Sequence, residues 1–138
     1  MKNLIIKVFL IFIITILLLG ILNLLYNLFG NNSVNLKEIT SSEREKILEV
    51  VGLNNINDNF ELERLEKPKT YKDIYYILYF SMNLSNNQDR LNDRKIGNVD
   101  INFNKIEEKD NITKYRCTIS NMGKSIQVLE QLIDKYKK

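Results

Sequence analysis

The chain has 138 residues, the length of one small domain together with a targeting or membrane segment. Hydrophobic residues make up 44% of it and charged residues 27%, the balance of a folded protein. It contains no His and a single Cys, which excludes histidine-based triads, cysteine–histidine dyads, histidine metal sites and an internal disulfide. We therefore expect neither a cofactor nor a catalytic role.

An apolar segment near the N-terminus predicts a membrane location. Fifteen residues from Val8 to Leu22 carry no charge, and the apolar character continues to Phe29. As a helix, Val8 to Phe29 would be about 33 Å long, close to the thickness of the hydrocarbon layer of a bilayer. Lys2 and Lys7 precede the segment, as they would in a secretory signal or a signal anchor.

The segment after the apolar run is a poor match to a signal-peptidase site. Gly30 and Ser33 are the small residues available, and Leu28 and Asn31 stand two positions before them. We therefore favour an uncleaved signal-anchor helix over residues 1–29, with cleavage as the alternative. The lysines before the helix lie nearer the membrane edge than those after it, which predicts a cytoplasmic N-terminus and an extracytoplasmic C-terminal domain.

Three residues of the apolar segment share one helical face. Gly20, Asn23 and Asn27 are spaced as i, i+3 and i+7, so they could contact another transmembrane helix. The alternative is that the two asparagines mark the interfacial end of the span.

The rest of the chain predicts one small α+β domain. Residues 30–38 read as a linker and residues 39–138 as the domain. Residues 30–138 carry a net charge of +1, so no nucleic-acid partner is expected.

The elements follow from capping and periodicity. Capping boxes at Thr40 and Ser42 begin a helix that ends at Gly52. Apolar residues at helical spacing from Met122 to Tyr136 predict a C-terminal helix packed on the sheet. Alternating or aromatic-rich runs predict a four-stranded antiparallel sheet. Its strands are residues 60–63, 73–82, 99–104 and 112–120, with the second in the centre.

Three features of the domain are candidates for function. Tyr75, Ile77 and Tyr79 share one face of the central strand and would be exposed if the helices cover only the other face. If both faces are covered, the row belongs to the core. The loop of residues 85–98 could hold a cation or a partner. Its candidate residues are Asn86, Asn87, Asp89 and Asp93. Cys117 alternates with Tyr115 and Ile119 and is expected to be a buried small hydrophobe.

These observations favour a single-pass membrane protein whose domain works by protein–protein contact in the cell envelope. Its expected partners are the lipid bilayer and a protein. One alternative is a ligand-binding domain or enzyme that uses the loop of residues 85–98. A second is an immunity or regulatory protein that acts within the membrane through Gly20, Asn23 and Asn27.

Overall fold

The computed structural model describes residues 2–29, 31–54, 60–69, 73–83 and 91–137. The chain divides into two compact units, residues 1–30 and residues 31–138. The first unit contains a single helix, α1 (Lys2–Phe29). Within it, Leu4–Leu25 is long and apolar enough to cross a membrane, with a mean hydropathy of 3.1, although a signal sequence would have the same properties.

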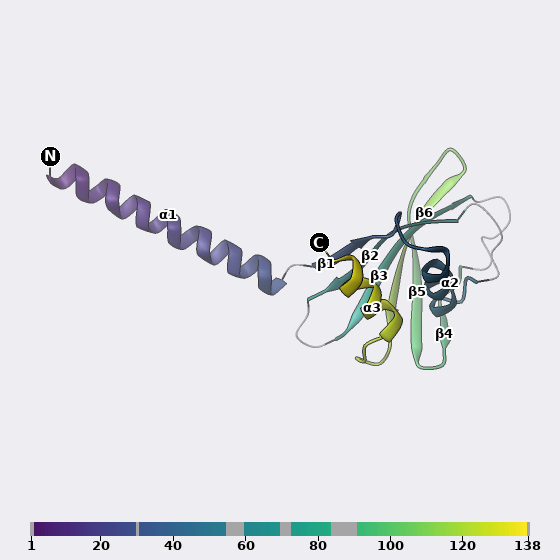
Figure 1. Ribbon diagram of the computed structural model, residues 1–138. Helices are drawn as coiled ribbons and strands as arrows, with labels where there is room; N and C mark the ends of the chain where they lie inside the picture. Colours follow the sequence, from purple (N-terminus) through teal and green to yellow (C-terminus); the bar gives the residue numbers. More distant parts are fainter. Residues whose placement is uncertain (1, 30, 55–59, 70–72, 84–90, 138) are drawn as a thin grey trace. The chain divides into compact units, whose positions relative to one another are not determined.

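The second unit is an α+β domain with a six-stranded antiparallel sheet (Figure 1). The strand order is β1-β2-β3-β6-β5-β4. The strands are β1 (Asn31–Asn35), β2 (Phe60–Pro68), β3 (Tyr75–Asn83), β4 (Arg94–Ile96), β5 (Val99–Lys109) and β6 (Ile112–Ser120). Helix α2 (Ser41–Val50) follows β1, and helix α3 (Gln127–Tyr136) follows β6.

The prediction of four strands is wrong, because two edge strands carry no strand pattern in the sequence. β1 lies in the segment predicted as a linker, and its five residues NNSVN include one apolar side chain. β1 is held by pairing with β2 and by burial of Val34 opposite Leu65. β4 lies in the predicted loop and is only three residues long. Pairing with β5 holds β4 in the sheet.

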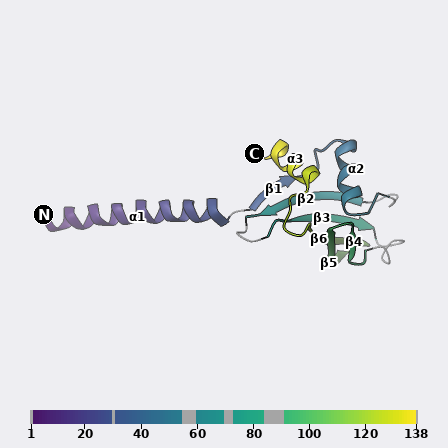
Figure 2. The same cartoon turned by 90° about the horizontal axis from the view of Figure 1, so that it is seen from below.

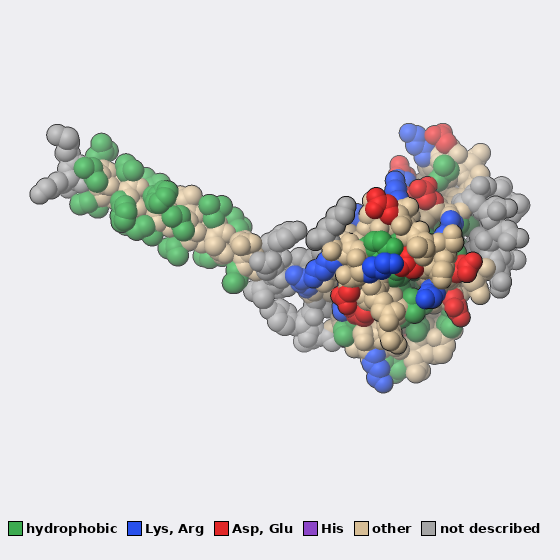
Figure 3. Space-filling model, in the orientation of Figure 1, with side chains coloured by type: hydrophobic (Ala, Val, Ile, Leu, Met, Phe, Trp, Pro, Cys, Tyr) green, Lys and Arg blue, Asp and Glu red, His purple; other side chains and the backbone are tan. Residues whose placement is uncertain are grey.

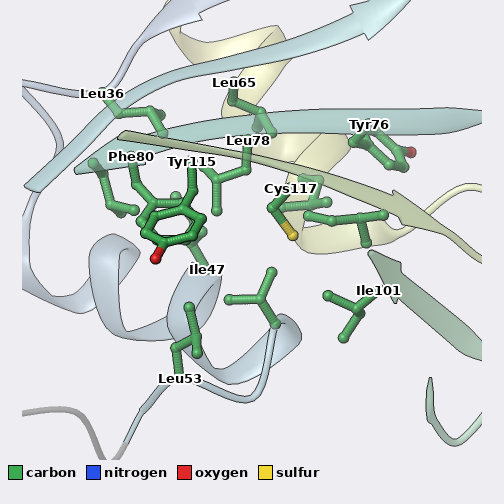
Figure 4. Close-up of a cluster of buried hydrophobic side chains, with 14 of the residues drawn as sticks. Leu36, Ile47, Leu53, Leu65, Tyr76, Leu78, Phe80, Ile101, Tyr115 and Cys117 are labelled. Carbon is green, nitrogen blue, oxygen red and sulfur yellow. The ribbon is translucent and has the colours of Figure 1, made fainter. Parts of the chain in front are cut away.

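The helices α2 and α3 lie on the same face of the sheet (Figure 2). The core-facing residues of β3 are Tyr76, Leu78, Phe80 and Met82, all buried. Those of β6 include Tyr115, Cys117 and Ile119, also buried, which confirms the predicted alternation. The helices contribute Ile47 from α2 and Leu129, Leu132 and Ile133 from α3. Figure 4 shows Ile47 and Leu53 facing Phe80 and Tyr115 across this core.

The predicted boundaries of α2 agree with the structure, whereas α3 begins later in the chain than predicted. Thr40 and Glu43 form the predicted capping box, and the chain turns away at Gly52, which has a φ of +68°. α3 begins at Gln127 rather than near Met122, because Met122 and Gly123 adopt positive φ values and lie in a turn. The turn between β5 and β6 also has positive φ values, at Asp110 and Asn111, which suit a two-residue hairpin.

Candidate interaction surfaces

The row of Tyr75, Ile77 and Tyr79 lies on the sheet face that α2 and α3 do not cover. These side chains are half-buried, whereas the alternating residues of β3 point into the core. The central position predicted for this strand is confirmed, since β3 pairs with β2 on one side and β6 on the other. We call this helix-free side of the sheet the outer face. Binding at the outer face stays a prediction.

Polar side chains surround the row on the neighbouring strands. Ile77 pairs with Glu66 of β2 and Thr118 of β6. Tyr79 pairs with Arg64 and Arg116 on the same two strands. An antiparallel sheet with one solvated face has this composition, with half-buried apolar residues between long polar side chains.

The two arginines beside Tyr79 differ in their contacts. The guanidinium carbon of Arg64 lies 4.2 Å from the centroid of the Tyr79 ring, and Arg64 Nε is 3.0 Å from Glu66 Oε1. Tyr79 Oη also donates a hydrogen bond of 3.4 Å to Glu66 Oε2. Arg116 is exposed and forms no ion pair with any residue that the structure describes. Arg116 is therefore the cation of this row that remains available to an incoming group.

Of the predicted loop of residues 85–98, the structure describes residues 91–98. Asn86, Asn87 and Asp89 lie outside the described residues. Asp93 precedes β4, and its Oδ1 accepts a 2.8 Å hydrogen bond from the backbone N–H of Phe103. That N–H lies on β5 just beyond the part that β4 covers, so Asp93 satisfies a donor on the sheet edge.

The predicted transmembrane face lies on α1. A Cβ added at Gly20 would have no described atom within 4 Å, so this face is open at that level. Asn23 takes part in an interaction within the chain. Asn27 belongs to the same helix, but its side chain lies outside the part that is described.

Cys117 is a core residue, as the sequence predicts. Its side chain is fully buried, and burial raises the pKa of the thiol to about 12, although nearby Arg94 lowers it in part. A thiol with this pKa stays protonated at neutral pH and is a poor nucleophile. Figure 4 shows its sulfur directed into the core.

A cluster around Glu43 joins the start of α2 to the end of α3. Besides the capping bonds to Thr40, the carboxylate accepts hydrogen bonds from Lys135 Nζ at 2.6 Å and Tyr136 Oη at 2.8 Å. The Lys135 bond is the main reason that the pKa of Glu43 falls to about 2, and the bonds from Thr40 and Tyr136 add to it. The sequence predicts the capping bonds but not the partners from α3.

We expect the Glu43 cluster to make stability depend on pH below neutrality. A carboxyl group with a pKa of about 2 in the folded state and 4.5 in its unperturbed state must take up a proton on unfolding between these values. Its stabilising effect is therefore complete above about pH 4.5 and lost as the pH falls towards 2.

Glu43→Gln should reduce the pH dependence of the free energy of unfolding between about pH 2 and 4.5 by up to one proton equivalent. It should also lower the free energy of unfolding at pH 7. The measurement is urea unfolding of the full chain in detergent at several pH values. Glu45→Gln, which removes an exposed charge from the same helix, is the matched control. A Glu43→Gln profile parallel to that of the unaltered protein would contradict the assigned contacts.

A second polar cluster fastens α3 to the sheet. Tyr76 Oη donates a 2.6 Å hydrogen bond to Glu130 Oε1 and accepts a 3.0 Å bond from the backbone N–H of Ile126. Lys67 Nζ donates to the same carboxylate oxygen of Glu130. Burial raises the pKa of the Tyr76 hydroxyl, so it remains a donor. The Ile126 bond satisfies one free N–H at the start of a helix that has no side-chain cap.

These clusters join α3 to α2 and to the sheet. Among the described residues there is no group of three or more His, Cys, Asp or Glu side chains placed to bind a metal ion. Comparisons with protein-family models, with curated proteins and with solved structures found no match.

Proposed function

We propose that this chain is a membrane-anchored protein whose extracytoplasmic domain is non-catalytic and works by contact with another protein. α1 is the anchor, and the outer face of the sheet is the contact surface. The apolar surface of α1 is the observation that carries the proposal.

The support for an anchor is the exposure of α1 along its length. Between Leu4 and Leu25, eighteen large hydrophobic side chains are each 40% to 67% exposed. Figure 3 shows apolar side chains covering the visible side of this helix. A stretch of 22 residues rises about 33 Å as a helix, which matches the hydrocarbon layer. An apolar surface of this size is unstable in water, and lipid would cover it.

The support for an extracytoplasmic domain is the distribution of lysines around the anchor. Lys2 and Lys7 flank the start of the apolar segment, whereas the first lysine after it is Lys37. Positive charge close to a span favours the cytoplasmic side. The lysine distribution therefore supports a cytoplasmic N-terminus and an extracytoplasmic domain.

The support for protein contact is the outer face. It combines a half-buried aromatic and aliphatic row with Arg116, which forms no ion pair with the residues that the structure describes. Tyrosine and arginine are enriched at the energetic centres of protein interfaces. The charges on the face of the domain seen in Figure 3 are of both signs. Residues 30–138 carry a net charge of +1, which argues against nucleic acid as the partner.

The test is photo-crosslinking of the full chain in its native membrane. A photoreactive amino acid replaces Ile77 on the outer face and, as a matched control, Gln131 on the exposed side of α3. We expect an adduct of one discrete mass from position 77, lost on Arg116→Glu, and none from position 131. No adduct at position 77, or one that survives Arg116→Glu, would contradict the proposed surface.

The same protein can test the ligand-binding alternative. Titration of the detergent-solubilised full chain with calcium and with cell-wall fragments should give no heat. Heat with either one would favour a ligand-binding domain over a protein-contact domain.

A further inference from the structure

We infer that two copies of this chain pair along β1, so that their sheets join edge to edge about a two-fold axis. The inference goes beyond the proposed function, because it concerns the free edge of the sheet and not the outer face. The hydrogen-bond pattern of the backbone, the composition of β1 and the contrast with the opposite edge of the sheet carry it.

β1 is an accessible edge strand. It ends the strand order of the sheet and pairs with β2 on one side. On its other side, no strand among the described residues pairs with it. Ser33 and Asn35 are exposed, and with Tyr136 of α3 they line part of an open depression of about 500 Å³. Another strand can therefore reach the free side of β1.

The backbone groups that face this free edge follow from one hydrogen bond. The N–H of Leu36, just after β1, donates a 3.0 Å hydrogen bond to the carbonyl oxygen of Glu63 on β2. Residues of an antiparallel pair direct their N–H and C=O groups alternately towards and away from the partner strand. Val34 therefore bonds to β2 as Leu36 does. The residues that direct their N–H and C=O groups to the free edge are Asn31, Ser33 and Asn35.

A hydrogen bond at the other side of the sheet agrees with this assignment. The alternation can be followed through the strand register from β1 across β2, β3 and β6 to β5. It directs the N–H of Phe103 away from β6. That N–H donates a 2.8 Å hydrogen bond to Asp93 Oδ1, just before β4. The same alternation therefore accounts for the backbone groups at both edges.

The composition of β1 favours a second copy of the chain as the occupant of this edge. Its five residues NNSVN carry no charge, so two copies can lie side by side without repulsion between like charges. In an antiparallel alignment centred on Ser33, Ser33 lies opposite its counterpart and Asn31 lies opposite the partner's Asn35. Every N–H and C=O that these residues direct to the free edge then has a partner. The pairing is self-complementary, as a two-fold interface requires.

The opposite edge of the sheet is protected against such pairing. β4 has three residues, and one of them is the exposed Lys95. Beyond β4, Asp93 occupies the edge-facing N–H of Phe103. Short strands and lysines are features by which natural sheets block the addition of another strand. β1 contains no Lys or Pro and has no bulge in its pairing with β2, so its edge remains open.

The test introduces a cysteine into the full chain at Ser33→Cys or, as a matched control, at Asn35→Cys. Freshly broken cells are oxidised with copper phenanthroline before fractionation. In the paired dimer the Cα atoms at position 33 lie about 5.5 Å apart, within the range of a disulfide. Those at position 35 lie about 14 Å apart along the strands, which is too far. Cys117 is fully buried with a raised pKa, so it does not react.

We expect position 33 to give several-fold more disulfide-linked dimer than position 35, with twice the mass of the chain. Equal yields at the two positions, or no dimer at position 33, would overturn the inference. An adduct of another mass at position 33 would also overturn it, because β1 would then receive a strand of a different protein. Fractionation of the same samples tests membrane anchoring separately, and crosslinking at Ile77 tests the outer face.

A second measurement tests the backbone hydrogen bonds of the paired edge. A nitroxide label on Asn35→Cys, in the full chain in detergent, should show dipolar broadening from the label on the partner copy. Adding Ser33→Pro removes an N–H that faces the free edge and leaves the bonds to β2 in place, so it should abolish the broadening. Adding Ser33→Ala keeps that N–H and should retain the broadening. Equal broadening in the Pro and Ala variants would contradict pairing along β1.

Discussion

Phe80→Ala should lower the free energy of unfolding of the domain by about 3–5 kcal/mol. Phe80 is fully buried at the centre of β3. Its ring centroid lies 4.6 Å from that of Phe60, 5.4 Å from that of Tyr115 and 6.2 Å from that of Phe103. Truncation removes all three aromatic contacts and leaves a cavity. Because small domains have only about 5–15 kcal/mol of stability, this is a large fraction of the total.

Tyr79→Ala is the matched control for Phe80→Ala, because it truncates an aromatic side chain on the opposite face of β3. Tyr79 is the adjacent residue on the outer face, where it is half-buried beneath Arg64. Its loss should cost about 1 kcal/mol, the magnitude of cross-strand and cation–π contacts at a solvated face. The measurement is urea unfolding of the full chain in detergent, followed by circular dichroism. Equal losses for the two variants would show that the outer face is covered as fully as the core face.

The double substitution Ile14→Asp, Leu17→Asp should release the chain from the membrane. The eighteen exposed apolar residues of the span favour insertion by about 5–11 kcal/mol in total, at about 0.3–0.6 kcal/mol each. Two aspartates near the middle of the span cost about 5–7 kcal/mol and also remove two apolar residues. The net free energy of insertion therefore changes from clearly favourable to weakly favourable or close to zero.

The control for this substitution keeps the apolar character of the span. Ile14→Leu with Leu17→Ile changes the same two positions and should leave the protein in the membrane pellet after an alkaline carbonate wash. Retention of the double aspartate variant in that pellet would mean that a contact other than the apolar span holds the protein there.

The sequence predicted those parts of the fold in which the local residue pattern matches the burial of the side chains in the structure. The capping box at Thr40 is formed by residues three positions apart, so it is visible locally. The aromatic and β-branched run of β3 is buried on one face and half-buried on the other, as expected of a central strand. Tertiary pairing alone determines β1 and β4, since neither NNSVN nor RKI alternates between apolar and polar residues over a useful length.

The candidate surfaces were predictable to a similar degree. Strand alternation places Tyr75, Ile77 and Tyr79 on one face of the sheet. It does not indicate whether α2 and α3 cover that face or the opposite one. Glu43 is recognisable as a capping residue, yet Lys135 and Tyr136 are more than 90 residues away in sequence. Hydrogen bonds of that kind leave no local pattern, and the same holds for Asp93 and the β5 edge.

The proposed function requires that α1 remains attached to the mature protein and holds the domain at the membrane. The most direct test is the intact mass and N-terminal sequence of the mature protein, measured separately on membranes and on the surrounding medium. We expect a chain of 16.3 kDa that keeps the apolar segment and stays with the membranes after an alkaline wash. A shorter chain that begins near Asn31 and is recovered in the medium would contradict it.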